Sequence, residues 1–180
     1  MPRISPVDIH NTDHNTAETL AAVKRKLGVL PNLLTTLAQS PAALNGYLQL
    51  SEAVAGGRLN AQQRELIAIA VAQENACEYC LSAHAAIGKG AGLDPQAISL
   101  ARSGHSDNII NEAILGFALR VVRTQGGVTD DDLRAIRASC NDEMIIEIVI
   151  NVVLNILTNY VNRVAGTDID FPRVDLDTAA

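Results

Sequence analysis

Helix-capping residues recur along the chain beside apolar segments of helical length, and they limit the possible fold more than any other feature. Asn60 stands three residues before Gln63, which is the spacing of a capping box. Asp94-Pro95 joins a capping residue to a proline that suits the first helical position. Glycine follows the expected ends of several segments, where it allows the chain to turn left-handed. The pattern predicts a chain built from helices.

The caps divide the sequence into about eight helices and one short helical turn. Asn15, with Glu18 three residues later, is expected to cap the first helix. No strand-length stretch alternates clearly with period two between turn residues, so the fold class is all-α, a compact helical domain. The helices are expected near residues 16–27, 41–55, 61–74, 77–91, 95–103, 107–125, 130–138 and 141–165, and the turn near residues 31–39.

A chain of 180 residues fits one domain and can bury a core without the help of disulfides or structural metal ions. We expect a single domain over residues 1–180, with residues 1–14 as an N-terminal arm and residues 167–180 as a C-terminal tail. Aromatic residues make up only 3% of the chain and Trp is absent, so the core must consist of Ala, Leu, Ile and Val. Ala and Leu favour helices.

The net charge of -6 and the lack of a basic stripe argue against a nucleic-acid partner. The N-terminus has no apolar signal core, and the apolar stretches are interrupted and look too short to cross a bilayer. These features predict a soluble cytoplasmic protein that is not bound to a membrane.

Three cysteines are too few for the disulfide framework of a secreted protein, and the pair Cys77 and Cys80 indicates redox or metal chemistry in a reducing compartment. A purely structural disulfide would close a very short loop and would constrain the unfolded chain little. Cys140 precedes the capping residue Asn141 and is expected to be a buried apolar residue.

Cys77, Cys80 and His84 are spaced to share one face at the start of a helix. The unpaired N–H groups and the dipole of a helix start favour thiolate over thiol, and the thiolate is the nucleophile. An imidazole titrates near neutral pH, so His84 can accept a proton from Cys80 or donate one to a leaving oxygen. A two-cysteine cycle through a sulfenic acid and a disulfide follows from this arrangement.

The central segment resembles the alkylhydroperoxidase D and carboxymuconolactone decarboxylase superfamily, in its peroxidase-related branch. Flanking segments extend the resemblance over most of the chain. The segments that carry it are Arg64-Glu65-Leu66, Asn75-Ala76-Cys77-Glu78-Tyr79-Cys80, Ala83-His84, Pro31-Asn32-Leu33-Leu34, Ser40-Pro41-Ala42, and Asn162-Arg163-Val164-Ala165 before Asp168 and Pro172.

The resemblance implies a role for each residue of the motif. Cys80 would attack a hydroperoxide, Cys77 would resolve the product, His84 would act as the base and Glu65 as the acid that anchors the proton relay. Tyr79 stands where alkylhydroperoxidase D has a second histidine, and we expect it to contact the substrate. The family implies a hydroperoxide substrate, an external thiol reductant, no cofactor and no metal, and a homo-oligomer, trimer or hexamer.

Two other functions are compatible with the sequence. The first is a lyase of the carboxymuconolactone decarboxylase type, although such relatives generally lack the paired cysteines. The second is a zinc-holding or redox-sensing oligomeric protein, in which Cys77, Cys80 and His84 would need a fourth ligand. The candidates for that ligand are Glu65, Cys140 and His105. A thioredoxin-type site is excluded because no strand precedes the cysteine pair.

Asparagines recur every three or four residues along one face of the last helix, at Asn151, Asn155, Asn159 and Asn162. Such a stripe is typical of a solvated face or of a subunit contact in which each amide finds a partner. We therefore expect the last helix to border a subunit interface. The histidines outside the motif, His10, His14 and His105, are expected in exposed loops.

Overall fold

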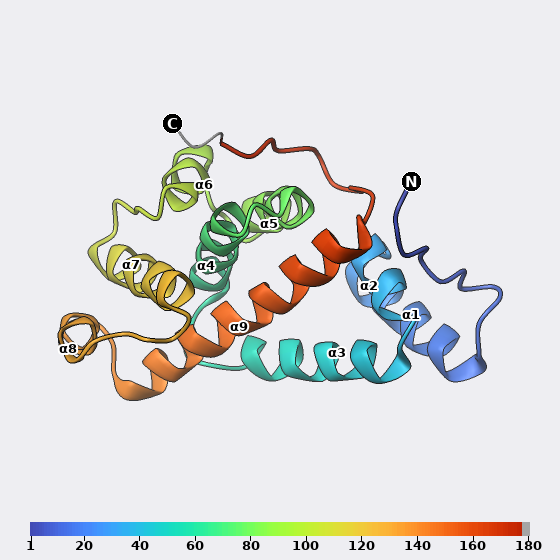
Figure 1. Cartoon of the computed structure of the whole chain (residues 1–180), viewed down its shortest axis with the longest axis horizontal. Helices are drawn as coiled ribbons and strands as arrows, with labels where there is room; N and C mark the ends of the chain where they lie inside the picture. Colours follow the sequence, from blue (N-terminus) through green and yellow to red (C-terminus); the bar gives the residue numbers. More distant parts are fainter. Residues whose placement is uncertain (178–180) are drawn as a thin grey trace.

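The computed structural model describes residues 1–177, and these residues form nine α-helices and no strand (Figure 1). The all-helical prediction is confirmed. The segment expected as a helical turn is a short helix, α2, which accounts for the ninth element. The helices are α1 (His14–Leu27), α2 (Asn32–Leu37), α3 (Pro41–Ala55), α4 (Ala61–Glu74), α5 (Glu78–Gly90), α6 (Pro95–Arg102), α7 (Ile109–Thr124), α8 (Asp130–Arg137) and α9 (Asp142–Ala165).

Helix α4 lies at the centre of the molecule and contacts α5, α6, α7 and α9 (Figure 1). Its residues 66–72 are all buried, because this stretch is apolar all round and therefore needs partners on every side. Leu66 and Ile69 join one hydrophobic cluster with α1, α2 and α5, whereas Ile67 and Val71 join a second cluster with α7, α8 and α9. The central helix thus belongs to both hydrophobic clusters, and this packing fixes its position in the molecule.

The capping residues set most helix starts as the sequence indicates. Asn60 and Gln63 form the expected reciprocal pair, with N···O distances of 2.9 and 3.1 Å. The first helix is an exception, because Asp13 rather than Asn15 is its cap and accepts the backbone N–H of Thr16 at 3.0 Å. Hydrogen bonds from Thr16 lower the pKa of Asp13, so a full negative charge lies at the positive end of the helix.

Helix α9 is long and apolar enough to cross a membrane by length and composition, with a mean hydropathy of 1.8 over its best window. The expectation that no apolar stretch is long enough is therefore wrong, because the interrupting asparagines carry no charge and lower the hydropathy only locally. Those asparagines are buried against other helices of the chain, and α9 contacts α2, α3, α4, α5, α7 and α8. Of the apolar window, 39% is buried inside the chain.

Both ends of the described chain lie on the helical body. Val7 N–H in the N-terminal arm donates to the carbonyl of Thr35 at 2.9 Å. After α9 the chain returns across α5, where Val174 N–H donates to Ser82 Oγ at 3.0 Å and Arg173 forms an ion pair with Glu78 at 2.7 Å (Figure 1). Residues 178–180 of the expected tail lie outside the described residues.

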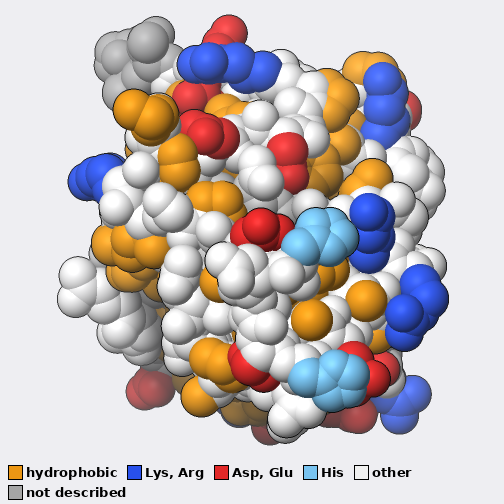
Figure 2. Space-filling view, turned by 90° about the vertical axis from the view of Figure 1, so that its right-hand side faces the viewer, with side chains coloured by type: hydrophobic (Ala, Val, Ile, Leu, Met, Phe, Trp, Pro, Cys, Tyr) orange, Lys and Arg blue, Asp and Glu red, His pale blue; other side chains and the backbone are white. Residues whose placement is uncertain are grey.

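Positive side chains are dispersed over the side of the molecule shown in Figure 2, where acidic and apolar groups lie among them. The basic residues Lys24, Arg25 and Lys26 fall in the last turn of α1, where they interact favourably with the helix dipole. Lys26 also lies 3.7 Å from Glu52 of α3. This face therefore offers no continuous basic surface, and the absence of a nucleic-acid partner stays a prediction.

Candidate active site

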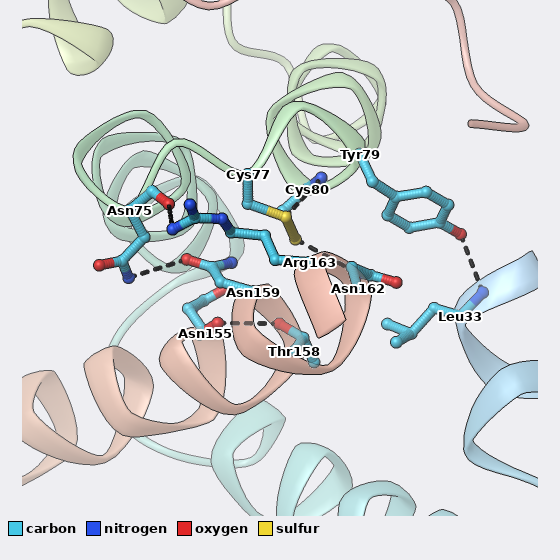
Figure 3. Close-up of a disulfide and its surroundings, with 10 residues drawn as sticks. All are labelled: Leu33, Asn75, Cys77, Tyr79, Cys80, Asn155, Thr158, Asn159, Asn162 and Arg163. Carbon is cyan, nitrogen blue, oxygen red and sulfur yellow. Dashed lines mark hydrogen bonds between the residues drawn. A yellow bond between two sulfur atoms is a disulfide. The ribbon is translucent and has the colours of Figure 1, made fainter. Parts of the chain in front are cut away.

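The cysteine pair lies directly after a sharp turn between α4 and α5. Ala76 in this turn has a φ of 50°, a left-handed conformation that non-glycine residues seldom adopt. The turn is held from α9: Arg163 Nη1 donates to the carbonyl of Asn75 at 2.8 Å, and Asn75 Nδ2 donates to Asn159 Oδ1 at 3.0 Å (Figure 3). The start of α5 is thereby fixed to a helix from the other end of the sequence.

Cys77 and Cys80 form a disulfide at the start of α5 (Figure 3). Cys77 is the N-cap of the helix, and its Sγ accepts the backbone N–H of Cys80 at 3.3 Å, which is the helix-start environment that the sequence predicts. The two residues are only 1% and 2% exposed. They differ in their surroundings, because Cys80 lines a cavity and Cys77 does not.

Glu65 and His84 form a hydrogen-bonded pair across α4 and α5. His84 Nδ1 and Glu65 Oε2 are 2.8 Å apart, and both side chains are largely buried. Gly88, one turn after His84, leaves room for Leu93, because a Cβ at this position would lie 3.0 Å from Leu93 Cδ1 and at an ordinary contact distance of 3.5 Å from Glu65 Cβ. A carboxylate in this position fixes the orientation of the imidazole.

A cavity of about 440 Å³ brings Glu65, Tyr79, Cys80 and His84 together. Its remaining wall is mostly apolar and comes from α1, α2, α3, α4, α5 and α9. Tyr47 of α3 also lines the cavity, and burial raises the pKa of its hydroxyl, with the nearby Glu65 charge adding to that effect and a hydrogen bond with Ser51 opposing it. The cavity can hold a small, largely apolar molecule in contact with one sulfur and one acid–base pair.

The asparagine stripe of α9 faces the interior of the chain. All four amides are at most 6% exposed, and Asn151, Asn155 and Asn162 line the cavity. The expectation that these amides form a solvated face or a subunit contact is therefore wrong. Periodicity shows that the four share a face, but it cannot show which surface covers that face. Tyr47, Asn155, Thr158 and Asn162 are cavity residues that the sequence did not identify as part of the site.

Tyr79 contributes its ring to the cavity and its hydroxyl to another element. Its Oη accepts the backbone N–H of Leu33 in α2 at 3.1 Å (Figure 3). Its ring lies edge-on to Phe171, with centroids 5.8 Å apart. Burial raises the pKa of this hydroxyl well above its ordinary value, so Tyr79 stays neutral. Because the hydroxyl is already bonded to Leu33, the ring is the part of Tyr79 that we predict to contact the substrate.

Replacing Tyr79 with phenylalanine is expected to lower the free energy of unfolding by about 1–3 kcal/mol, because the buried N–H of Leu33 loses its acceptor. Urea denaturation of the reduced protein measures this loss. Ser103→Ala is the control, since the exposed Ser103 hydroxyl donates to the carbonyl of Leu100 and its loss should change stability by less than about 0.5 kcal/mol. Equal effects of the two substitutions would contradict the assignment of the Tyr79 hydroxyl to Leu33.

Two of the three candidates for the fourth ligand of a zinc site, Cys140 and His105, are held elsewhere. Cys140 belongs to the second hydrophobic cluster, where burial raises the pKa of its thiol. His105 is exposed and pairs with Glu112 at 2.9 Å. Within residues 1–177, no group of three His, Cys, Asp or Glu side chains is arranged to hold a metal ion.

Comparison with known proteins finds a family that the segment around this site resembles. The model of the carboxymuconolactone decarboxylase family matches residues 41–123, which include Glu65, Cys77, Cys80 and His84. An uncharacterized protein of Haemophilus influenzae is 44% identical over 69 residues, which are 38% of this chain and 56% of that protein. The match thus spans little more than half the length of that relative.

Solved structures match the whole fold. The alkylhydroperoxidase AhpD core of a peroxidase-related protein from Ralstonia eutropha JMP134 has a TM-score of 0.85 at 24% identity, covering 94% of this chain and 92% of that one. A peroxidase-related protein from Silicibacter sp. TM1040 has a TM-score of 0.78 at 25% identity, covering 92% and 91%. The chain therefore has the fold of these peroxidase-related proteins, and its central segment, residues 41–123, is similar to the carboxymuconolactone decarboxylase family.

Proposed function

We propose that the protein is a thiol-dependent peroxidase that reduces hydroperoxides with its cysteine pair. The observation that carries this proposal is the common cavity: Cys80 Sγ and the hydrogen-bonded pair of Glu65 and His84 border the same space. The Cys77–Cys80 disulfide is the product that a two-cysteine cycle would leave. No cofactor or metal is needed for this chemistry.

In the reduced protein His84 takes the proton of the Cys80 thiol, and Glu65 stabilises the imidazolium. The thiolate attacks the terminal oxygen of the hydroperoxide, an S–O bond forms and the O–O bond breaks. The leaving alkoxide takes the proton from His84 and departs as an alcohol, which leaves Cys80 as a sulfenic acid. The Cys77 thiol then attacks the Cys80 sulfur, the S–S bond forms, and the hydroxyl leaves as water with the Cys77 proton.

An external dithiol restores the two thiols and is itself oxidised to a disulfide. A reductant of this kind is kept reduced in the cytoplasm, and we place the protein there. The apolar wall of the cavity favours an organic hydroperoxide over hydrogen peroxide, because the organic group can leave water on binding.

We also propose that the protein is a homo-oligomer, a trimer or a hexamer. Because the asparagines of α9 are buried within the chain, we propose that the opposite side of this helix forms the contact. The outward side of α9 exposes apolar side chains in a row, and light scattering would test whether copies associate. The exposed residues of this row are Ile146, Val153, Leu157, Tyr160 and Val164.

A single-turnover thiol count tests the peroxidase directly. The reduced protein, freed of reductant, has three thiols per chain, and one equivalent of cumene hydroperoxide should lower the count to one as an equal amount of alcohol forms. The remaining thiol should be Cys140, because it is buried away from the cavity. An unchanged thiol count, together with decarboxylation of a muconolactone, would instead support the lyase. Thiol loss without repeated turnover by a dithiol would support a redox sensor.

A further inference from the structure

Asn162 of α9 touches the sulfur that borders the cavity. Its Nδ2 lies 3.3 Å from Cys80 Sγ and donates a hydrogen bond to it. Figure 3 shows the amide nitrogen turned toward Cys80 and the oxygen turned toward the side on which Tyr79 and Leu33 lie. A thiolate accepts such a bond more strongly than a disulfide sulfur does, because it carries a full negative charge.

The other end of the same amide has no partner. Asn162 is only 3% exposed, it lines the cavity, and its Oδ1 accepts no hydrogen bond from any described residue. Buried amide oxygens are nearly always hydrogen-bonded, so an unpaired one in a cavity indicates a donor supplied by a bound molecule. The terminal O–H of a hydroperoxide is a donor of this kind.

Contacts on either side hold Asn162 in place. Asn159 and Arg163, its neighbours on α9, bind the turn that precedes the cysteine pair. The backbone carbonyl of Asn162 accepts the N–H of Gly166 and, at 3.2 Å, that of Thr167. The amide is therefore fixed relative to the sulfur before a ligand arrives, which is the condition under which a hydrogen-bond donor contributes most to a reaction.

We propose, on the basis of the peroxidase function above, that Asn162 is a catalytic residue that binds the sulfur and the attacked oxygen at once. Its Nδ2–H stabilises the Cys80 thiolate, and its Oδ1 accepts the terminal O–H of the hydroperoxide, which places that oxygen beside Sγ. As the S–O bond forms and the O–O bond breaks, sulfur loses two electrons to the peroxide. The hydrogen stays on the transferred oxygen and remains bonded to Asn162 Oδ1 in the sulfenic acid, while the leaving alkoxide takes its proton from His84.

Two measurements on Asn162→Ala and Asn162→Asp test this role, both in a Cys77→Ser background where Cys80 reacts alone at the site. The first is the pH profile of Cys80 alkylation by iodoacetamide, with the modified residue located by mass spectrometry. Asn162→Ala should move its midpoint to higher pH, and Asn162→Asp should move it further, because a carboxylate repels the thiolate. The second is the rate constant for cumene hydroperoxide at a pH where Cys80 is fully ionised, which should fall about 10²-fold in Asn162→Ala.

Asn141→Ala is the control, because it removes an asparagine from the start of the same helix, where its Oδ1 accepts the backbone N–H of Met144 and has no contact with sulfur. It should lower the melting temperature and leave the alkylation midpoint near that of the parent. An alkylation midpoint and a hydroperoxide rate constant in Asn162→Ala equal to the parent values would overturn the proposal, even if the melting temperature falls. Asn162→Asp has nearly the volume of the natural residue and gives the same test if the alanine variant does not fold.

The alkylation profile needs no hydroperoxide, so the two proposals can fail separately. A parent protein that consumes no hydroperoxide, with a shifted midpoint in Asn162→Ala, would contradict the peroxidase function and retain the contact to sulfur. An active parent with an unshifted midpoint would contradict the role of Asn162 alone.

Discussion

Cys80→Ser is expected to reduce hydroperoxide consumption to the uncatalysed rate, because the serine hydroxyl stays protonated where a thiol can ionise and attack. Cumene hydroperoxide loss in the presence of excess dithiothreitol measures the effect. Cys140→Ser should keep wild-type turnover, since Cys140 is also buried but lies in the second hydrophobic cluster and does not line the cavity. A Cys80→Ser protein as active as Cys140→Ser would remove the proposed nucleophile.

Cys77→Ser separates the two sulfurs. It retains Cys80 and should form one equivalent of alcohol, after which the sulfenic acid accumulates and can be trapped with dimedone. The serine can still cap α5, because its Oγ can accept the backbone N–H that Cys77 Sγ accepts. A Cys77→Ser protein that forms neither the alcohol nor a dimedone adduct on Cys80 would contradict the assigned roles.

Glu65→Gln and His84→Ala are each expected to lower the rate constant for hydroperoxide by about 10² to 10⁴-fold, the usual contribution of a positioned acid–base group. Glutamine keeps the size and a hydrogen-bonding group of Glu65 but loses the charge that stabilises the imidazolium, 2.8 Å away. Stopped-flow kinetics under single-turnover conditions measure this step without the reductant. Because the two groups act as a unit, the double variant should lose little more than either single variant.

The chain contains a matched control for this pair. His105 Nδ1 lies 2.9 Å from Glu112 Oε1, so it is a second histidine–glutamate pair, but an exposed one far along the chain from the cysteines. Glu112→Gln should leave the rate constant at the wild-type value. If Glu65→Gln were as harmless as Glu112→Gln, the proton relay would have no support.

The helices could be predicted from local chemistry, since a cap or a breaker acts within a few residues of its own position. Thr129 and Asp132 form the expected capping box at the start of α8, and Asn141 caps α9 as expected. The start of α1 was wrong because Asp13 and Asn15 are both good caps. Asp13 accepts the N–H of Thr16, whereas Asn15 would accept an N–H two or three residues after itself, and the sequence does not show which bond forms.

The site was only partly predictable because its residues meet through packing. The spacing of Cys77, Cys80 and His84 follows from one helix, and Glu65 was found by resemblance rather than by geometry. Tyr47 comes from α3, and no local pattern connects it with α5. The asparagines of α9 were assigned to the wrong surroundings, because polar side chains usually face water and here they surround a cavity.

Cys77 is buried and does not line the cavity, whereas Cys80 lines it together with Glu65 and His84. Under the proposed chemistry, oxidant and reductant therefore reach the protein through the same cavity and react at the same sulfur atom. Neither can bind while the other is present. Under the proposed chemistry this gives a substituted-enzyme mechanism, with alternating half-reactions and parallel lines in double-reciprocal plots. A high concentration of either partner would then slow the enzyme by occupying the space that the other needs.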